Sequence, residues 1–182
     1  LYRTLGRTGL KISIAGLGTG GASKLGQNTG RTRAESRRVV RKALDLGINI
    51  FDSSPSYGES EALLGKALEG VPRDRYVLAT KFQPKADDEI HDDPQALMEQ
   101  LEQSLRRLHV DTIDVLQYHG VGPEIYRQVV DHFHPVALRA QEAGKVRFLG
   151  ITETVAGDPR HEMLQMALQE DLFDTFMVKY GI

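Results

Sequence analysis

The sequence predicts an α/β protein in which a parallel β-sheet is covered by helices. Short apolar runs alternate with longer amphipathic segments along the chain. Each run and the segment after it take roughly 30 residues, which is the size of a βαβ unit. The amphipathic segments are also bounded by helix-capping residues. This alternation fits either a doubly wound open sheet or a (β/α)8 barrel, and the pattern alone leaves both architectures open.

The strands are expected where short apolar runs end in polar or turn-forming residues. A small hairpin is expected first, because Tyr2–Thr4 and Leu10–Ser13 flank the turn sequence Gly6-Arg7-Thr8-Gly9. It is too short to belong to the main sheet, and we expect it to plug one end. The strands of the main sheet are expected in six runs: Ile14–Leu17, Ile48–Asp52, Tyr76–Lys81, Thr112–His119, Val146–Ile151 and Thr175–Lys179.

The helices are expected to begin at capping residues. Thr32 and Glu35 have the spacing of a capping box, which predicts a helix over Ser36–Leu46 that stops at Gly47. Ser60 is expected to cap a helix over Glu61–Leu68. The other helices are expected from Asp93-Pro94 to about Leu108, over Pro135–Ala143, and from Asp158-Pro159 to about Gln169. The first of these places one apolar face along Leu97, Leu101, Leu105 and Leu108.

Composition excludes several classes of protein. The 182 residues include no cysteine, which excludes disulfides, thiolate nucleophiles, iron–sulfur clusters and cysteine-based zinc sites. The formal net charge of −2 gives no sign of a nucleic-acid partner or an anionic membrane surface. No apolar run reaches the ~18 residues of a membrane span. We therefore expect a single domain over residues 1–182 in a reducing, cytoplasmic setting.

Ionisable residues stand at the ends of three consecutive strands. Asp52, Lys81 and His119 close the second, third and fourth apolar runs, and Tyr57 lies five residues beyond Asp52. The carboxyl ends of parallel strands meet at one edge of the sheet, and neighbouring strands lie about 4.8 Å apart. We therefore expect these side chains to converge.

The four side chains suit the reduction of a carbonyl group. A carboxylate favours the charged form of a neighbouring lysine, and the ammonium in turn stabilises the phenolate form of a nearby tyrosine. Tyr57 can then act as a proton donor, and His119 can polarise a carbonyl through a hydrogen bond. No side chain supplies hydride, so this chemistry requires a nicotinamide or a flavin.

These residues carry a resemblance to a known family. Asp52, the sequence Tyr57-Gly-Glu-Ser-Glu61, Lys81 and the run that ends at His119 together resemble the aldo-keto reductases over essentially the whole chain. The resemblance implies a (β/α)8 barrel that uses NADP(H) or NAD(H) to reduce aldehydes or ketones reversibly. It implies that Tyr57 is the general acid, that Lys81 eases its ionisation with Asp52 as the lysine's partner, and that His119 orients the carbonyl of a small-molecule substrate.

The resemblance also implies residues that contact the cofactor. In this family the segment that contains Gly18 and Thr19 lies near the nicotinamide, as does Asp52. Where the fifth strand ends, the family commonly has a Ser-Asn-like pair that holds the carboxamide. This chain has Thr152 and Glu153 there, and Met177 where a family glutamine would stand on the sixth strand.

The number of strands implies a barrel that is incomplete at its C-terminal side. A (β/α)8 barrel typically takes about 250 residues, and only about six βα strands are expected here. The remaining two strands would carry the phosphate and adenosine contacts of the cofactor. Two alternatives to an enzyme therefore stay open: a non-catalytic module that binds cofactor or a partner, and an inactive fragment of the enzyme. Substrate identity, preference between NADP and NAD, and oligomeric state are not predicted.

Other motifs support rival classes less well. Gly16, Gly18 and Gly21 match the G-x-G-x-x-G pattern, but no helix begins directly after them, as a Rossmann site requires. No tyrosine has a lysine four residues later, which excludes a short-chain reductase. We expect His132 and His134 to be solvated loop histidines rather than metal ligands, and Ala86–Asp93 to be a solvated loop. No metal site is expected.

Overall fold

The main sheet consists of six parallel strands in the computed structural model of the chain, which describes residues 1–86, 88–154 and 157–179. Each expected run contains or overlaps one of these strands, with ends shifted by up to three residues. The strands are β3 (Leu17–Gly18), β4 (Ile50–Asp52), β5 (Val77–Phe82), β8 (Ile113–Val121), β9 (Val146–Glu153) and β10 (Thr175–Met177).

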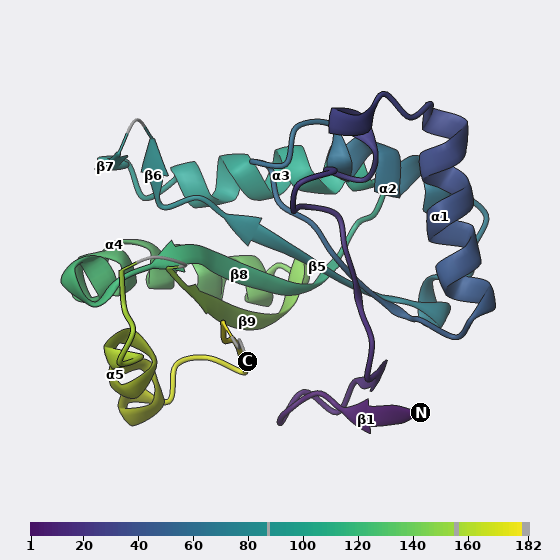
Figure 1. Cartoon of the computed structure of the whole chain (residues 1–182). Coiled ribbons are helices and arrows are strands. Elements are labelled where there is room, and N and C mark those ends of the chain that lie inside the picture. Colours follow the sequence, from purple (N-terminus) through teal and green to yellow (C-terminus); the bar gives the residue numbers. More distant parts are fainter. Residues whose placement is uncertain (87, 155–156, 180–182) are drawn as a thin grey trace.

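The order of the strands distinguishes between the two architectures. Along the sheet they follow the order of the chain, β3-β4-β5-β8-β9-β10. In a doubly wound sheet the direction of growth reverses at a switch point, whereas here each strand is added on the same side of the one before. All crossovers therefore pass over the same face. The sheet curls, with its helices outside, into part of a (β/α) barrel (Figure 1).

Among the described helices, all but α4 begin within four residues of the expected capping residues, although Ser60 is itself the first residue of its helix and does not cap it. The Thr32 side chain accepts a hydrogen bond from Glu35 N, and the Glu35 side chain accepts one from Thr32 N, so the predicted capping box is formed. The helices are α1 (Arg33–Asp45), α2 (Ser60–Leu68), α3 (Ala96–Leu108), α4 (Pro123–Glu142) and α5 (Glu162–Glu170), with 3₁₀ turns at Gln27–Thr29 and Arg73–Arg75.

The core lies between the helices and the convex face of the sheet. The predicted apolar face of α3 is buried along its whole length, at Leu97, Leu101, Leu105 and Leu108. These side chains belong to one hydrophobic cluster with residues of four strands, namely Phe51, Leu78, Leu116 and Leu149. Burying each large aliphatic side chain contributes roughly 1.5–3 kcal/mol, which holds α3 against the sheet.

Helix α4 corrects the sequence prediction. The helix was expected over Pro135–Ala143, with His132 and His134 in a solvated loop, but it begins at Pro123 and both histidines are half-buried inside it. Apolar residues continue at helical spacing through Pro135, and their burial outweighs the cost of an internal proline. They are Tyr126, Val129, Val130, Phe133, Val136, Ala137 and Ala140.

The segment after β5 contains a small hairpin where only a solvated loop was expected. Lys85–Ala86 (β6) pairs antiparallel with Glu89–Ile90 (β7). The turn between them uses Asp88 in the left-handed region, with φ of 67°. Figure 1 shows this hairpin projecting from the sheet beside α3. It therefore lies above the carboxyl end of β5.

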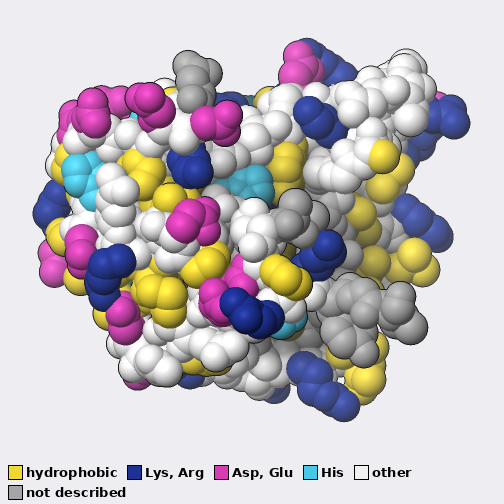
Figure 2. Space-filling view, turned by 60° about the vertical axis from the view of Figure 1, so that its left-hand side comes forward, with side chains coloured by type: hydrophobic (Ala, Val, Ile, Leu, Met, Phe, Trp, Pro, Cys, Tyr) yellow, Lys and Arg dark blue, Asp and Glu magenta, His cyan; other side chains and the backbone are white. Residues whose placement is uncertain are grey.

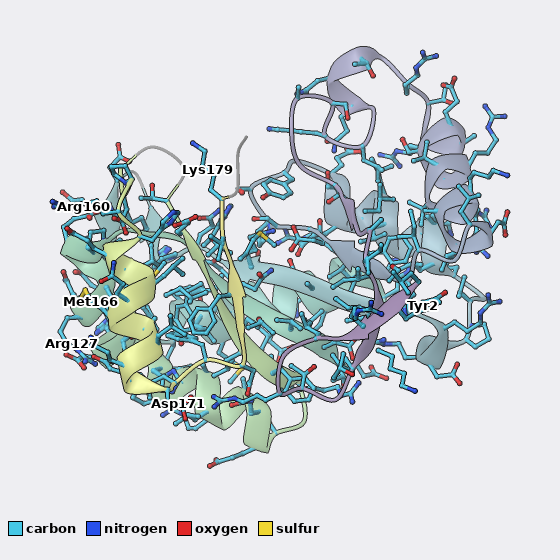
Figure 3. The ribbon with its side chains drawn as sticks, turned by 60° about the horizontal axis from the view of Figure 1, so that its bottom comes forward. Tyr2, Arg127, Arg160, Met166, Asp171 and Lys179 are labelled. Carbon is cyan, nitrogen blue, oxygen red and sulfur yellow. The ribbon has the colours of Figure 1, made fainter. Side chains whose placement is uncertain are left out.

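The N-terminal hairpin forms as predicted and lies across the amino end of the sheet. Strands β1 (Tyr2–Thr4) and β2 (Lys11–Ser13) pair antiparallel. On one side, Tyr2 Oη donates to Gly47 O at 2.8 Å. On the other, Arg7 forms ion pairs with Asp171 at 2.6 Å and Asp174 at 3.0 Å. Figure 3 views the molecule from this end, with Tyr2 on the hairpin and Asp171 at the end of α5. The hairpin therefore connects segments from both ends of the chain.

On the face shown in Figure 2, acidic side chains gather along the upper left edge, whereas acidic, basic and hydrophobic side chains are interspersed over the rest of the face. Within the described residues, no helix has the length and hydropathy needed to cross a bilayer.

Candidate active site

The carboxyl edge of the sheet brings the predicted ionisable residues together. Asp52 is the last residue of β4, Lys81 lies near the end of β5, and His119 lies near the end of β8. In the strand register Asp52 pairs with Ala79, and Lys81 pairs with Gln117. The side chain of Lys81 therefore starts one layer above that of Asp52, within reach of it.

Lys81 is buried and held by two acceptors. Its side chain is 1% exposed, and Nζ donates to Asp52 Oδ1 at 2.5 Å and to Ser53 O at 2.7 Å. The other carboxylate oxygen of Asp52 accepts from Gln117 Nε2 at 2.9 Å. Burying an ammonium is costly unless it is paired and hydrogen-bonded, and here it is both. Gln117 was not singled out from the sequence, although a glutamine inside an apolar strand is a detectable signal.

Tyr57 stands against this cation. Lys81 Nζ lies 4.9 Å from the centroid of the Tyr57 ring, a distance typical of a cation–π contact. The ring of His119 meets the same tyrosine edge to face, with centroids 5.8 Å apart and an interplanar angle of 84°. The Tyr57 side chain is only partly exposed, so its neighbours limit the motion of the ring while part of it stays accessible. The four predicted residues therefore form one cluster.

The loop that carries Tyr57 depends on two glycines and a glutamine. A Cβ on Gly20 would lie 2.7 Å from Cε2 of the Tyr57 ring, so only glycine leaves room for the ring there. Gly58 has φ of +64° and also leaves space for Gln27. Gln27 Nε2 donates to Tyr57 O at 3.1 Å, and its Oε1 accepts from Glu59 N at 2.8 Å. Sequence reasoning missed Gly20 and Gln27, because these contacts join segments about 30 residues apart.

The rest of the Tyr-Gly-x-Ser-Glu motif anchors the start of α2. Ser60 Oγ donates to Thr19 O at 2.9 Å. Glu61 is fully buried, accepts from Thr80 Oγ1 at 2.6 Å, and forms an ion pair with Arg107 at 3.3 Å. Thr80 directly precedes Lys81, so the motif ties the tyrosine loop to the strand that carries the lysine.

His119 is neutral at ordinary pH. Its Nδ1 lies 2.6 Å from Gln83 Nε2 and 3.4 Å from Ser54 Oγ. Burial, and secondly the charge of Lys81, lower the pKa of His119 to about 4 from its ordinary value of 6.5. A neutral imidazole can donate one hydrogen bond and accept another, which is what orienting a carbonyl oxygen requires.

An irregular segment of β8 sets the position of His119. The pairing of β8 with β9 shifts register between Tyr118 and Val121, and Gly120 there has φ of +63°. Gly120 N donates to Thr152 Oγ1 at 2.8 Å, which fixes the irregularity against the end of β9. Strand irregularities of this kind often redirect a side chain beside a functional site.

The residues expected to contact a cofactor have different surroundings. Gly18 is exposed, and nothing lies within 4 Å of the position a Cβ would take. Thr19 is fully buried and donates to Ser53 Oγ at 2.8 Å, so its side chain supports the floor of the site from within. Thr152 is buried, and within the described part of the chain its Oγ1 accepts from Gly120 N and donates to no group, which leaves its hydroxyl hydrogen available.

Glu153 is buried and engaged by the protein itself. Its Oε2 lies 2.6 Å from His161 Nδ1, and its Oε1 accepts from Lys179 N. Its side chain is only 2% exposed. Each carboxylate oxygen has a second lone pair, so Glu153 can still accept a hydrogen bond from an amide group. Met177, by contrast, offers no such polar group.

A cavity of about 440 Å³ opens beside His119. Its polar groups come from Gln83, Lys85, Asp88 and His119, and Ile125 adds an apolar wall. The acidic segment that the sequence assigned to solvent therefore contributes Asp88 to the rim of this cavity. Within the described residues, no cluster of three or more His, Asp or Glu side chains is arranged to hold a metal ion.

Comparisons with known proteins show the family. A sequence model described as "Aldo/keto reductase family" matches residues 16–176. L-galactose dehydrogenase of Arabidopsis thaliana is 38% identical over 155 residues, which cover 82% of this chain and 47% of that protein. 6-Dehydroglucose reductase of Novosphingobium aromaticivorans is 37% identical over 167 residues, which cover 83% of this chain and 51% of that protein. The chain thus spans about half the length of the curated relatives it matches.

Solved structures show the same similarity. An aldo-keto reductase from Bacillus halodurans in its holo form superposes with a TM-score of 0.75 at 26% identity, covering 98% of this chain and 57% of that one. A thermostable aldo-keto reductase solved with the inhibitor epalrestat gives a TM-score of 0.77 at 26% identity, covering 99% and 62%.

Proposed function

The chain belongs to the aldo/keto reductase family, and from this premise we propose that it reduces an aldehyde or ketone to an alcohol, reversibly, with NADP(H) or NAD(H). The observation that carries the proposal is the cluster in which a buried, paired Lys81 faces Tyr57, with His119 beside the same ring. Each member of this cluster has a role in moving one proton to a carbonyl oxygen.

Tyr57 is the proton donor in this proposal. As the substrate carbonyl becomes an alkoxide, the Tyr57 hydroxyl transfers its proton to that oxygen, and the phenolate that remains faces the Lys81 ammonium. The positive charge stabilises the phenolate and so lowers the barrier to transfer. In the oxidative direction the phenolate takes the proton back from the alcohol.

Asp52 and His119 support this step in different ways. Asp52, with Gln117 and Ser53 O, keeps Lys81 charged and fixed in the interior. His119 is neutral and donates a hydrogen bond to the carbonyl oxygen, which orients the substrate between the imidazole and the phenol. Because His119 carries no charge near pH 7, it does not compete with Tyr57 as the acid.

The residues at the strand ends fit the nicotinamide half of a cofactor. The carboxamide of a nicotinamide needs one donor and one or two acceptors, and Thr152 Oγ1–H and the free lone pairs of Glu153 supply them. Gly18 leaves the backbone open to close approach beside Asp52. When bound, the nicotinamide supplies or accepts the hydride; the proton remains the task of Tyr57.

A small hydroxylated carbonyl compound is the substrate that the surroundings of His119 favour. The cavity beside this residue offers Gln83, Lys85 and Asp88, which can donate to and accept from hydroxyl groups. Two similar proteins are named for sugar chemistry, L-galactose dehydrogenase and 6-dehydroglucose reductase. We expect an aldose or a hydroxy-aldehyde to react with a higher kcat/KM than an alkyl aldehyde of the same length.

The proposal is tested by following NADPH and NADH absorbance with hydroxylated and alkyl aldehydes, using the purified protein and its Tyr57→Phe variant. Removing the acid should lower kcat by roughly 100-fold or more while the Kd for the cofactor stays the same. Retention of wild-type turnover by Tyr57→Phe would show that the assigned mechanism is wrong. Cofactor binding by the unmodified protein without turnover of any aldehyde would instead support the non-catalytic alternative.

A further inference from the structure

His119 Nδ1 has two potential hydrogen-bond donors within reach. Gln83 Nε2 lies 2.6 Å from His119 Nδ1, and Ser54 Oγ lies 3.4 Å from the same atom. Gln83 follows β5 directly, two residues after Lys81, so the strand that delivers the lysine also delivers this amide. Gln83 also lines the cavity beside His119, but the proton transfer proposed above does not use it.

The backbone of Gln83 is held by α3. Gln83 N donates to Gln100 Oε1 at 3.0 Å, and Gln100 Nε2 donates back to Gln83 O at 3.2 Å. The same Gln100 nitrogen lies 3.2 Å from His91 Nε2. A side-chain amide that binds both backbone groups of one residue fixes that residue's position closely. The amide of Gln83 is therefore presented to His119 from a rigid support.

The chemistry of these groups decides which nitrogen of His119 carries the hydrogen. The NH₂ of a carboxamide only donates hydrogen bonds. Ser54 Oγ accepts from Ser56 N at 3.2 Å and also lies 2.9 Å from Ser56 Oγ. When Ser56 Oγ is the donor of that pair, the hydrogen of Ser54 points at the imidazole as a second donor. With donors on that side, Nδ1 must accept, and in a neutral imidazole the hydrogen then resides on Nε2.

We propose that Gln83 is a positioning residue that fixes His119 in the Nε2–H tautomer, so that the imidazole presents a donor to the substrate oxygen. The opposite tautomer would present a lone pair to the carbonyl oxygen and repel it. The importance of this tautomer for turnover rests on the proposed carbonyl reduction, whereas the tautomer itself can be measured without any substrate.

The first experiment reads the tautomer directly. Long-range ¹H–¹⁵N correlation spectra of ¹⁵N-labelled protein distinguish the protonated from the unprotonated ring nitrogen, and the six histidines make the spectrum assignable. His119 is identified by the signals lost in His119→Gln. We expect Nε2 protonated and Nδ1 unprotonated at neutral pH. A protonated Nδ1 would mean that Gln83 Oε1 is the atom facing the ring, and would overturn the proposal.

Two variants test whether Gln83 causes this preference. Gln83→Leu removes the donor, and we expect both tautomers of His119 to be populated. Gln83→Glu keeps the size and replaces the donor with an acceptor, so the His119 signals should move to a protonated Nδ1. Gln95→Leu is the matched control, because Gln95 is an exposed glutamine that also precedes α3 in the sequence. Unchanged tautomers in Gln83→Glu would overturn the proposal even if Gln83→Leu does not fold.

Turnover provides the second readout. We expect Gln83→Leu and Gln83→Glu to lower kcat by roughly 10- to 100-fold, as removal of a group that orients an active side chain commonly does, with the Kd for NADPH unchanged. Absence of activity in the unmodified protein would overturn the proposed function but leave the tautomer measurement decisive. Wild-type kcat in a Gln83→Glu variant with a flipped tautomer would overturn the role of Gln83 while the proposed function stands.

Discussion

At the amino end of the sheet the carboxylate of Asp114 is buried between two half-exposed arginines, whereas at the carboxyl end the buried partner is the cation. The Asp114 side chain is 1% exposed, and Arg73 and Arg147 reach it from solvent at 2.5 and 2.8 Å. The Lys81 side chain is likewise 1% exposed, and its partner Asp52 is 21% exposed. Both clusters are ion pairs, but the buried partner is the carboxylate in the first and the ammonium in the second.

This difference in which partner is buried gives the Asp114 and Lys81 clusters different roles. Asp114 also accepts from Leu78 N at 2.8 Å, so both its oxygens bind neighbouring segments and β5, β8 and β9 are joined at their starts. Lys81 instead directs its charge toward Tyr57. A buried cation beside a partly exposed phenol can act on a reacting group, whereas a buried, fully bonded carboxylate can only stabilise the fold. We therefore expect substitutions at the two ends to separate activity from stability.

The largest separation is expected for Lys81→Met. Loss of the cation that stabilises the Tyr57 phenolate should lower kcat/KM by roughly 10³-fold. The free energy of unfolding should fall by about 2 kcal/mol, because Asp52 and Ser53 O lose their donor. The cost is below that of a fully buried pair, since Asp52 is 21% exposed and keeps its bond to Gln117. Aldehyde reduction and urea denaturation measure the two quantities. A variant that unfolds but retains specific activity would reverse the assignment of the two clusters.

The opposite outcome is expected for Asp114→Ala. Removing this carboxylate leaves two arginines and a backbone amide without their acceptor, at a cost of about 3 kcal/mol in the free energy of unfolding. The kcat per folded molecule should be unchanged. Asp111→Ala is the matched control at an exposed aspartate just before β8, with an expected change within about 0.5 kcal/mol. Equal destabilisation by both variants would contradict the role given to Asp114.

A smaller effect at the carboxyl end is expected for Gly20→Ala. The added methyl group would overlap the Tyr57 ring, which must move away from Lys81, so kcat should fall by roughly 30-fold. The double variant with Tyr57→Phe provides the control, since Gly20→Ala should have little further effect once the hydroxyl is gone. Additive losses in the double variant would show that Gly20 acts by some route other than Tyr57.

The smallest effect is a pH dependence of stability. The pKa of His119 is about 4 in the folded chain and near its ordinary value of 6.5 when unfolded, so the unfolded state binds more protons between these values. Stability is therefore fully present above pH 6.5 and is lost as the pH falls toward 4. Allowing for partial exposure, the unmodified protein should lose about 1 kcal/mol more than His119→Gln between pH 7 and pH 5.

Denaturation of the two proteins at both pH values measures this difference, and the carboxylates, which titrate in both, cancel in the comparison. A difference that stays constant with pH would show that the His119 imidazole is not desolvated in the folded chain.

Much of the site could be predicted from the sequence because strand ends are marked by a change from apolar to ionisable residues. Asp52, Lys81 and His119 each stand at such a change, and parallel strands bring their ends to one edge. Tyr57 follows Asp52 by only five residues, so its presence near the cluster needed no long-range information. The capping box at Thr32 and the apolar face of α3 were predictable for the same reason, since both depend on local spacing.

The remaining features depend on contacts that the sequence does not mark. Gly20 matters because a ring 37 positions later occupies the space of its missing side chain, and Gln83 matters because of its distance to His119. Helix α4 runs through Pro135 because buried residues on both sides of it outweigh the local cost. In each case tertiary packing decides what the local pattern leaves open.

The hairpin at the amino end of the sheet has a kinetic consequence. Arg7 binds Asp171 and Asp174, which lie more than 160 positions later, and Asp174 in turn accepts from Leu149 N on β9. Contacts across so much chain carry a high cost in loop-closure entropy, and we expect them to form after the local βα units. Interactions that are absent from the folding transition state act on the unfolding rate alone. We therefore expect the hairpin to slow the unfolding of the chain and to have little influence on its folding rate.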